Sequence, residues 1–139
     1  MEELIVRLHS SKCSCVIATS ETVRVCYQRG IKDLYEIYTT EPKTLSGATV
    51  ADKVVGRAAA AIMILGGVKR VYADTISALA LDLFAKSSVE VSYGQVVPHI
   101  INRAKSGLCP LESATKDVDS LDKIFDIIDD FRTQESTIE

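Results

Sequence analysis

The longest apolar stretch of the sequence runs from Ala58 to Val68, and it constrains the fold more than any other feature. Four alanines are followed by isoleucine, methionine, isoleucine and leucine, and the stretch ends in Gly66-Gly67, a pair that stops helices. It is too short for the roughly 20 apolar residues of a membrane span, so we predict a buried helix. Because nearly every side of this helix is apolar, other elements must cover most of it.

The residues just before this stretch carry charges that need a physical reason. Thr49 and Asp52 have the spacing of a capping box, so we expect the helix to begin there. Lys53 and Arg57 then fall in its first two turns, where a cation opposes the positive end of the helix dipole. An anionic ligand would make that arrangement favourable, which makes Lys53 the first candidate for a functional residue.

The first third of the chain predicts a helix, a hairpin and a second helix. Residues 4–8 carry a one-sided apolar stripe typical of a short helix lying on a sheet. Residues 14–18 and 22–27 are β-rich and are separated by a turn, which predicts a hairpin whose second strand lies near a sheet edge. The apolar spacing over 34–38 predicts another short helix.

The middle of the chain alternates between strands and helices. We predict a strand at 68–73, a helix capped by Asp74 or Thr75, and a strand at 89–93. Strands joined through helices indicate right-handed parallel crossovers, and hence an α/β sandwich with helices on both faces of the sheet. Residues 96–101 have helical spacing and predict one more short helix.

The last part of the chain predicts two helices. Pro110 suits the first position of a helix, which would place Cys109 at its N-cap. The apolar spacing over 118–131 predicts an amphipathic helix with acidic residues at its start, followed by a frayed tail at about 133–139. No linker or repeat divides the chain, so we expect a single domain over 1–139.

Composition and charge exclude several classes of function. The chain has 139 residues, of which 47% are hydrophobic and 25% charged, with a net charge of -3. This balance provides no basic surface for nucleic acid or anionic lipid. The N-terminus lacks the pattern of a signal peptide and no run could span a membrane, so we expect a cytoplasmic protein.

The four cysteines and two histidines do not suggest a metal centre. In a cytoplasmic chain the thiols stay reduced, and we expect no disulfide. Cys13 and Cys15 are separated by one residue, closer than the ligands of structural zinc sites, and neither histidine has a matching spacing. We therefore expect no metal and no other cofactor.

Four segments of the sequence carry a family resemblance: Ala51–Ala60, Gly66–Ala73, Val91–Gly94 and Gly107–Glu112. They resemble a prokaryotic family of unknown function that is assigned to the cytidine deaminase-like fold. The resemblance implies a three-layer α/β/α sandwich with a mixed sheet of four to five strands. It implies no particular reaction, since the function of that family is unknown.

Active members of that fold bind zinc through H-x-E at the start of one helix and P-C-x-x-C at the start of the next. By the order of elements, the segments Ala51–Lys53 and Asp74–Ser77 occupy these places, and neither contains a cysteine or histidine. The resemblance thus implies a degenerate pocket without zinc. Such a site lacks the metal-bound water that hydrolytic deamination of a base requires.

Two helix N-termini would meet at one edge of this sheet and offer their amides to a phosphate or carboxylate. The expected ligand-binding residues are Thr49, Arg57, Asp74, Thr75 and Ser77. The expected catalytic residues are Asp52, Lys53 and Cys109, since a thiol at a helix start can have a lowered pKa. Structural roles remain open: the two basic side chains can extend to solvent beside Asp52, and Cys109 can be a buried cap.

Three functions are consistent with these residues. The first is a binding module that holds a nucleotide or a similar phosphate-bearing small molecule without converting it. The second is an enzyme of unknown reaction that uses Asp52, Lys53 and Cys109. The third is a structural protein whose apolar faces form a homo-oligomer.

Overall fold

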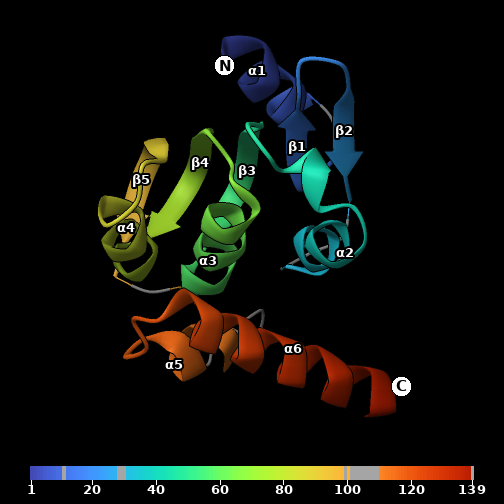
Figure 1. Cartoon of the computed structure of the whole chain (residues 1–139). Coiled ribbons are helices and arrows are strands. Elements are labelled where there is room, and N and C mark those ends of the chain that lie inside the picture. Colours follow the sequence, from blue (N-terminus) through green and yellow to red (C-terminus); the bar gives the residue numbers. More distant parts are fainter. Residues whose placement is uncertain (11, 28–30, 99, 101–109, 139) are drawn as a thin grey trace.

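A five-stranded mixed sheet organises the protein, as seen in a computed structural model that describes residues 1–10, 12–27, 31–98, 100 and 110–138 (Figure 1). The strand order is β2-β1-β3-β4-β5. Strand β1 runs antiparallel to both neighbours, whereas β3, β4 and β5 are parallel. The strands are β1 (Cys15–Ala18), β2 (Val23–Cys26), β3 (Thr49–Val55), β4 (Arg70–Ser77) and β5 (Glu90–Val97).

Helices lie on both faces of this sheet, as the sequence predicts. Helix α1 packs against β1 and β3 on one face, while α3 lies on the other face between α2 and α4. Helices α5 and α6 pack against α3, with α6 crossing below the sheet in Figure 1. The helices are α1 (Glu2–Ser10), α2 (Lys32–Thr40), α3 (Arg57–Gly66), α4 (Ala78–Ala85), α5 (Pro110–Thr115) and α6 (Leu121–Ile138), with a 3-10 turn η1 (Pro42–Thr44).

Helix α3 is the buried helix expected from the apolar stretch. Every residue from Arg57 to Met63 is buried. The helix ends at Gly67, whose φ of 84° is left-handed and therefore suits glycine. Gly66 faces Leu45 closely: a Cβ at this position would lie 2.7 Å from Leu45 Cδ1. The glycine pair therefore both stops the helix and lets it approach the preceding loop.

The predicted helix start at Thr49 is wrong, because residues Thr49–Val55 form β3. This strand lies between β1 and β4 and is covered by helices on both faces, so it lacks the alternation that distinguishes a half-buried strand. Its valines favour an extended backbone. The helix begins only at Arg57, after Gly56. Thr49 and Asp52 consequently have the spacing of a capping box without its geometry.

Two further boundaries differ from prediction for the same reason. Strand β4 continues to Ser77, so Asp74 and Thr75 are strand residues and do not cap a helix. Strand β5 continues to Val97, which contradicts the helix predicted over 96–101 as far as that segment is described. Both strands extend beyond their predicted ends because β-branched residues follow there. These residues are Thr75 and Ile76 in β4, and Val96 and Val97 in β5.

The remaining described elements agree with the sequence. The hairpin of β1 and β2 forms, and β2 is an edge strand. Helix α5 begins at Pro110, and α6 runs to Ile138, through most of the segment expected to fray. Cys109 lies outside the described residues. Among the helices of the described chain, none is both long enough and apolar enough to cross a membrane.

Candidate functional site

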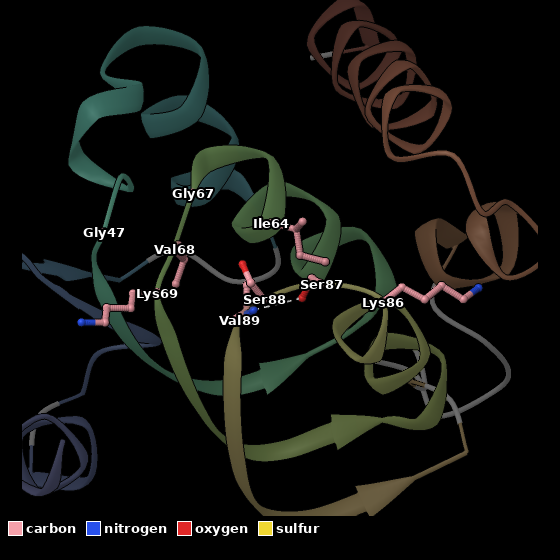
Figure 2. Close-up of a pocket in the computed structure, with 9 residues that line it drawn as sticks. All are labelled: Gly47, Ile64, Gly67, Val68, Lys69, Lys86, Ser87, Ser88 and Val89. Atoms are coloured by element: carbon pink, nitrogen blue, oxygen red, sulfur yellow. Dashed lines mark hydrogen bonds between the residues drawn. The ribbon is translucent and has the colours of Figure 1, made fainter.

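A hollow of about 480 Å³ opens where α3 and α4 end (Figure 2). Lys69 and Lys86 lie at opposite ends of it and point away from each other. Among the described residues, none of those predicted from the sequence as site residues lines this hollow. Its lining consists of Gly47, Ile64, Gly67, Val68, Lys69, Lys86, Ser87, Ser88 and Val89.

The predicted residue Asp52 belongs to a different group, at the middle of the sheet. Cys26, Cys15 and Asp52 are direct neighbours on β2, β1 and β3 in the strand register. Since residues opposite each other in a sheet share a face, these three side chains lie on the same side, which is the side of α3. We call this group the Asp52 cluster.

The carboxyl group of Asp52 is buried, with 7% of the residue exposed. Burial raises its pKa from 3.8 to about 7, because the charged form loses its hydration. Hydrogen bonds from the backbone N–H groups of Val54 and Lys53 act in the opposite direction, and the negative charge of Asp74 raises the pKa further. Asp52 can therefore gain or lose a proton near neutral pH.

The two thiols of the cluster hydrogen-bond each other. Each cysteine is 4% exposed, and both are free. The hydrogen bond and burial raise the pKa of Cys15, and the nearby charge of Asp52 adds to this. The same hydrogen bond lowers the pKa of Cys26, since it stabilises the Cys26 thiolate. The sequence led us to interpret both cysteines only as core residues, because their pairing depends on strand register.

The Asp52 cluster lies where the antiparallel part of the sheet meets the parallel part. Strand β1 runs antiparallel to β3 on one side, whereas β4 runs parallel to it on the other. Asp52 is the fourth of the seven residues of β3, so it lies at the middle of this strand.

Lys53 follows Asp52 directly in β3. Its side chain is partly exposed, whereas Asp52 is buried. The backbone N–H of Lys53 donates to the Ser14 carbonyl at 3.1 Å. Cys109, the third predicted catalytic residue, lies outside the described residues.

Asp74 lies on the α1 side and binds two neighbours. Its Oδ1 atom lies 2.7 Å from Nε2 of His9 and accepts a hydrogen bond of 2.8 Å from the Tyr72 hydroxyl. The bond to Asp74 raises the pKa of Tyr72. Thr75 accepts a side-chain hydrogen bond from Gln95 at 3.0 Å. These contacts are partly exposed. Asp74 and Thr75 both lie within β4, before the start of α4.

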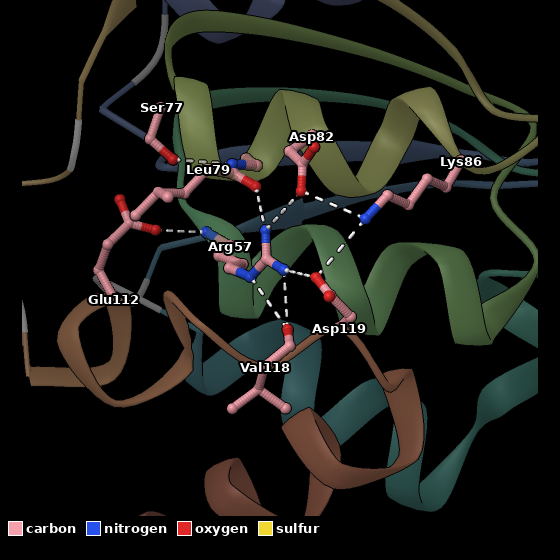
Figure 3. Close-up of polar contacts among 9 residues, drawn as sticks. Arg57, Ser77, Leu79, Asp82, Lys86, Glu112, Val118 and Asp119 are labelled. Atoms are coloured by element: carbon pink, nitrogen blue, oxygen red, sulfur yellow. Dashed lines mark hydrogen bonds and ion pairs between the residues drawn. The ribbon is translucent and has the colours of Figure 1, made fainter.

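Arg57 was expected to bind a ligand, but its side chain joins elements of the protein to one another (Figure 3). The residue is only 1% exposed. Its Nε and Nη2 atoms donate to the Val118 carbonyl, and its Nη1 donates to the Leu79 carbonyl at 2.8 Å. Ion pairs to Asp82 and Asp119 use the remaining N–H groups. A guanidinium has five N–H donors, so none remains for a ligand.

A residue that the sequence did not suggest occupies the start of α3. Glu112, from α5, is buried and accepts a hydrogen bond of 2.7 Å from the backbone N–H of Arg57 (Figure 3). Its second oxygen accepts one of 2.6 Å from the N–H of Ile100. A Cβ on Gly56 would lie 3.2 Å from this carboxylate, so glycine helps it approach. In the sequence Glu112 is one acid in a helix beginning with proline, which gives no signal for this role.

The start of α4 is also occupied. Ser77 is buried, and its hydroxyl oxygen accepts a hydrogen bond of 3.0 Å from the Ala80 N–H, as an N-cap does. Thr49 begins β3 and pairs with Ala18 and Arg70, at the opposite end of that strand from α3. Of the residues predicted to bind a phosphate, Arg57 and Ser77 therefore lie at the two helix starts, whereas Thr49 does not.

The helix starts also correct the comparison with zinc-dependent deaminases. They lie at Gly56-Arg57 and Ser77-Ala78, further along the chain than the segments compared above. Neither contains a cysteine or histidine. Within the residues that the structure describes, no three histidine, cysteine or acidic side chains are grouped as metal ligands.

The fold and the Asp52 cluster define an α/β sandwich protein with a buried carboxyl group beside two thiols. Its family is established by comparison: residues 4–132 match the model of TM1506, a domain of unknown function (DUF1893), and the chain belongs to this family. A crystal structure of a DUF1893 family protein (TM1506) from Thermotoga maritima is similar, with a TM-score of 0.84 and 23% sequence identity. The match covers 91% of this chain and 86% of that one, and at this identity it establishes the fold alone. No match was found among curated proteins.

Proposed function

We propose that the protein binds a small molecule beside Asp52, where β1 and β3 are neighbours, and exchanges a proton with it through this carboxyl group. The observation that carries this proposal is the buried Asp52 carboxyl with a pKa of about 7. A general acid or base works best when its pKa lies near the working pH. A buried carboxyl group with a pKa shifted in this way is a candidate for a functional site.

The proposed reaction class is general acid–base catalysis on a small polar substrate. Asp52 is its candidate catalytic residue, and the thiol of Cys15 lies next to it in the strand register. The side chain of Lys53, the next residue of β3, is partly exposed and is given no role in this proposal. The hydrogen bonds from Lys53 and Val54 N–H groups fix the orientation of the carboxyl group.

A titration of Asp52 tests this proposal directly. Carboxyl carbon resonances are followed by NMR from pH 4 to 9 in the parent protein and in Asp52→Asn, which identifies the signal. We expect a midpoint near 7 that shifts when a substrate-class molecule binds. A midpoint near 4 would refute the proposal, because Asp52 would then be permanently ionised at neutral pH.

A second candidate function, binding of a nucleotide or another phosphate-bearing molecule, is supported by the hollow at the ends of α3 and α4. Its volume of about 480 Å³ suits a small-molecule ligand. Lys86 is shared with Asp82 and Asp119, each 3.5 Å away, so Lys69 is the better candidate for a phosphate contact. The separation of the two lysines favours an elongated ligand (Figure 2).

Thermal melts with a panel of nucleotides test this second candidate. A binding nucleotide raises the melting temperature of the parent and raises that of Lys69→Ala less. Lys123→Ala, on exposed α6 surface, is the matched control and should respond like the parent. Equal shifts in all three proteins would place the ligand elsewhere.

A further inference from the structure

We propose that Cys15 and Cys26 form a reversible redox site, in which a hydroperoxide oxidises the two thiols to a disulfide. This goes beyond the acid–base function proposed for Asp52, although it involves the same cluster. The two cysteines are paired across antiparallel strands, with their side chains on one face. Residues opposite each other in such a pair have Cα atoms about 4.5–5.5 Å apart, within the range that a disulfide spans.

The interaction between the thiols agrees with their pairing in the strand register. The two side chains are close enough for each to shift the pKa of the other. The hydrogen bond lowers the pKa of Cys26 and raises that of Cys15, which makes Cys26 the better nucleophile. Cys26 ends its strand and precedes Tyr27, which is exposed, whereas Cys15 lies one strand further into the sheet.

The chemistry has two steps and balances. The Cys26 thiolate attacks one oxygen of hydrogen peroxide, the O–O bond breaks, and the departing hydroxide takes up a proton to become water. The sulfenic acid on Cys26 is then attacked by the Cys15 sulfur. An S–S bond forms, the S–O bond breaks, and the second hydroxide leaves as water with the proton of the Cys15 thiol. Asp52, which neighbours Cys15, is placed to accept that proton in passing.

Cys13 offers a matched control within the same chain. It is buried like the other two, but its thiol donates to the carbonyls of Leu8 and Arg7 on the α1 side. It therefore has no thiol partner among the described residues. Cys109 lies outside the described residues and is replaced by serine as a second control.

The test is mass spectrometry of the purified protein after treatment with hydrogen peroxide and alkylation of remaining thiols. We expect a mass loss of two hydrogen atoms, a linked peptide pair containing Cys15 and Cys26, and full reversal by dithiothreitol. Cys13→Ser and Cys109→Ser should form the same disulfide, whereas Cys15→Ser and Cys26→Ser should not. A disulfide that involves Cys13 or Cys109, or irreversible addition of oxygen instead, would overturn the proposal.

The peptide map of the unmodified sequence decides the question even if a serine variant fails to fold.

Asp52→Asn separates this proposal from the acid–base function. We expect the disulfide in this variant to form to the same extent, at a lower rate, while the titration near pH 7 disappears. Loss of the disulfide in a folded Asp52→Asn protein would mean that the thiols are not an independent redox pair.

Discussion

Replacement of Asp52 by asparagine should make the protein more stable at alkaline pH and should remove a large part of its pH dependence. In the folded protein the pKa of Asp52 is about 7, whereas its ordinary value is 3.8. Between these two values the folded state holds a proton that the unfolded state has released. The stability contributed by the neutral carboxyl is therefore fully present below pH 4 and is lost as the pH rises through 7.

The raised pKa sets the size of this effect. For each pH unit between the unfolded and the folded pKa of Asp52, the free energy of unfolding falls by about 1.4 kcal/mol. About 4 kcal/mol is therefore lost between pH 4 and pH 7. Asparagine has nearly the same shape and does not titrate. We expect the two proteins to differ by less than about 1 kcal/mol at pH 5, and we expect the variant to be more stable by about 2–4 kcal/mol at pH 8.

Urea denaturation at several pH values from 5 to 8.5 measures this difference. Asp126→Asn, at an exposed position on α6, is the control for replacing a carboxylate as such. Its difference from the parent should stay nearly constant over this range. If the difference between the parent and Asp52→Asn is equally constant, Asp52 is ionised in the folded protein and the reasoning fails.

Three further predictions, on a buried network, a helix cap and a close backbone approach, are tested by the same denaturation assay. Arg57→Ala should lower the free energy of unfolding by about 3–5 kcal/mol because it breaks a buried network. Arg70→Ala, at a surface ion pair, should lower it by less than about 1 kcal/mol. Equal losses in the two variants would contradict the buried network. Ser77→Ala should cost about 1 kcal/mol through loss of the α4 cap, and no loss would mean that the cap is replaced. Gly66→Ala should cost about 1–3 kcal/mol because its Cβ would overlap Leu45, and a gain would show that Leu45 moves aside.

The sequence predicted most elements because their apolar periodicity was clear. The buried helix over Arg57–Gly66, the amphipathic α6 and the hairpin were all identified in this way. The error at β3 has a physical origin. A central strand buried on both faces has no alternation, and the alanine-rich helix that follows makes the two appear as one apolar segment. Only the neighbouring strands β1 and β4 decide that Thr49–Val55 is extended.

The candidate site was predictable only in part. Asp52 was selected because it has the spacing of a capping box with Thr49 at the charged start of a predicted helix, and it does lie in the buried cluster. The reason given for it, a helix cap, was wrong. The contribution of Cys15 and Cys26 depends on cross-strand register, which a single sequence does not provide. For the same reason, no pattern could assign Glu112, 55 residues from Arg57, to the start of α3.

Glu112 also explains why a phosphate site at the start of α3 is not built as the sequence suggested. A helix N-terminus favours a negative charge, and the protein supplies its own from α5. A ligand phosphate at this position would have to displace the Glu112 carboxylate from two backbone N–H groups. The displaced charge would remain buried without a partner, which costs several kcal/mol.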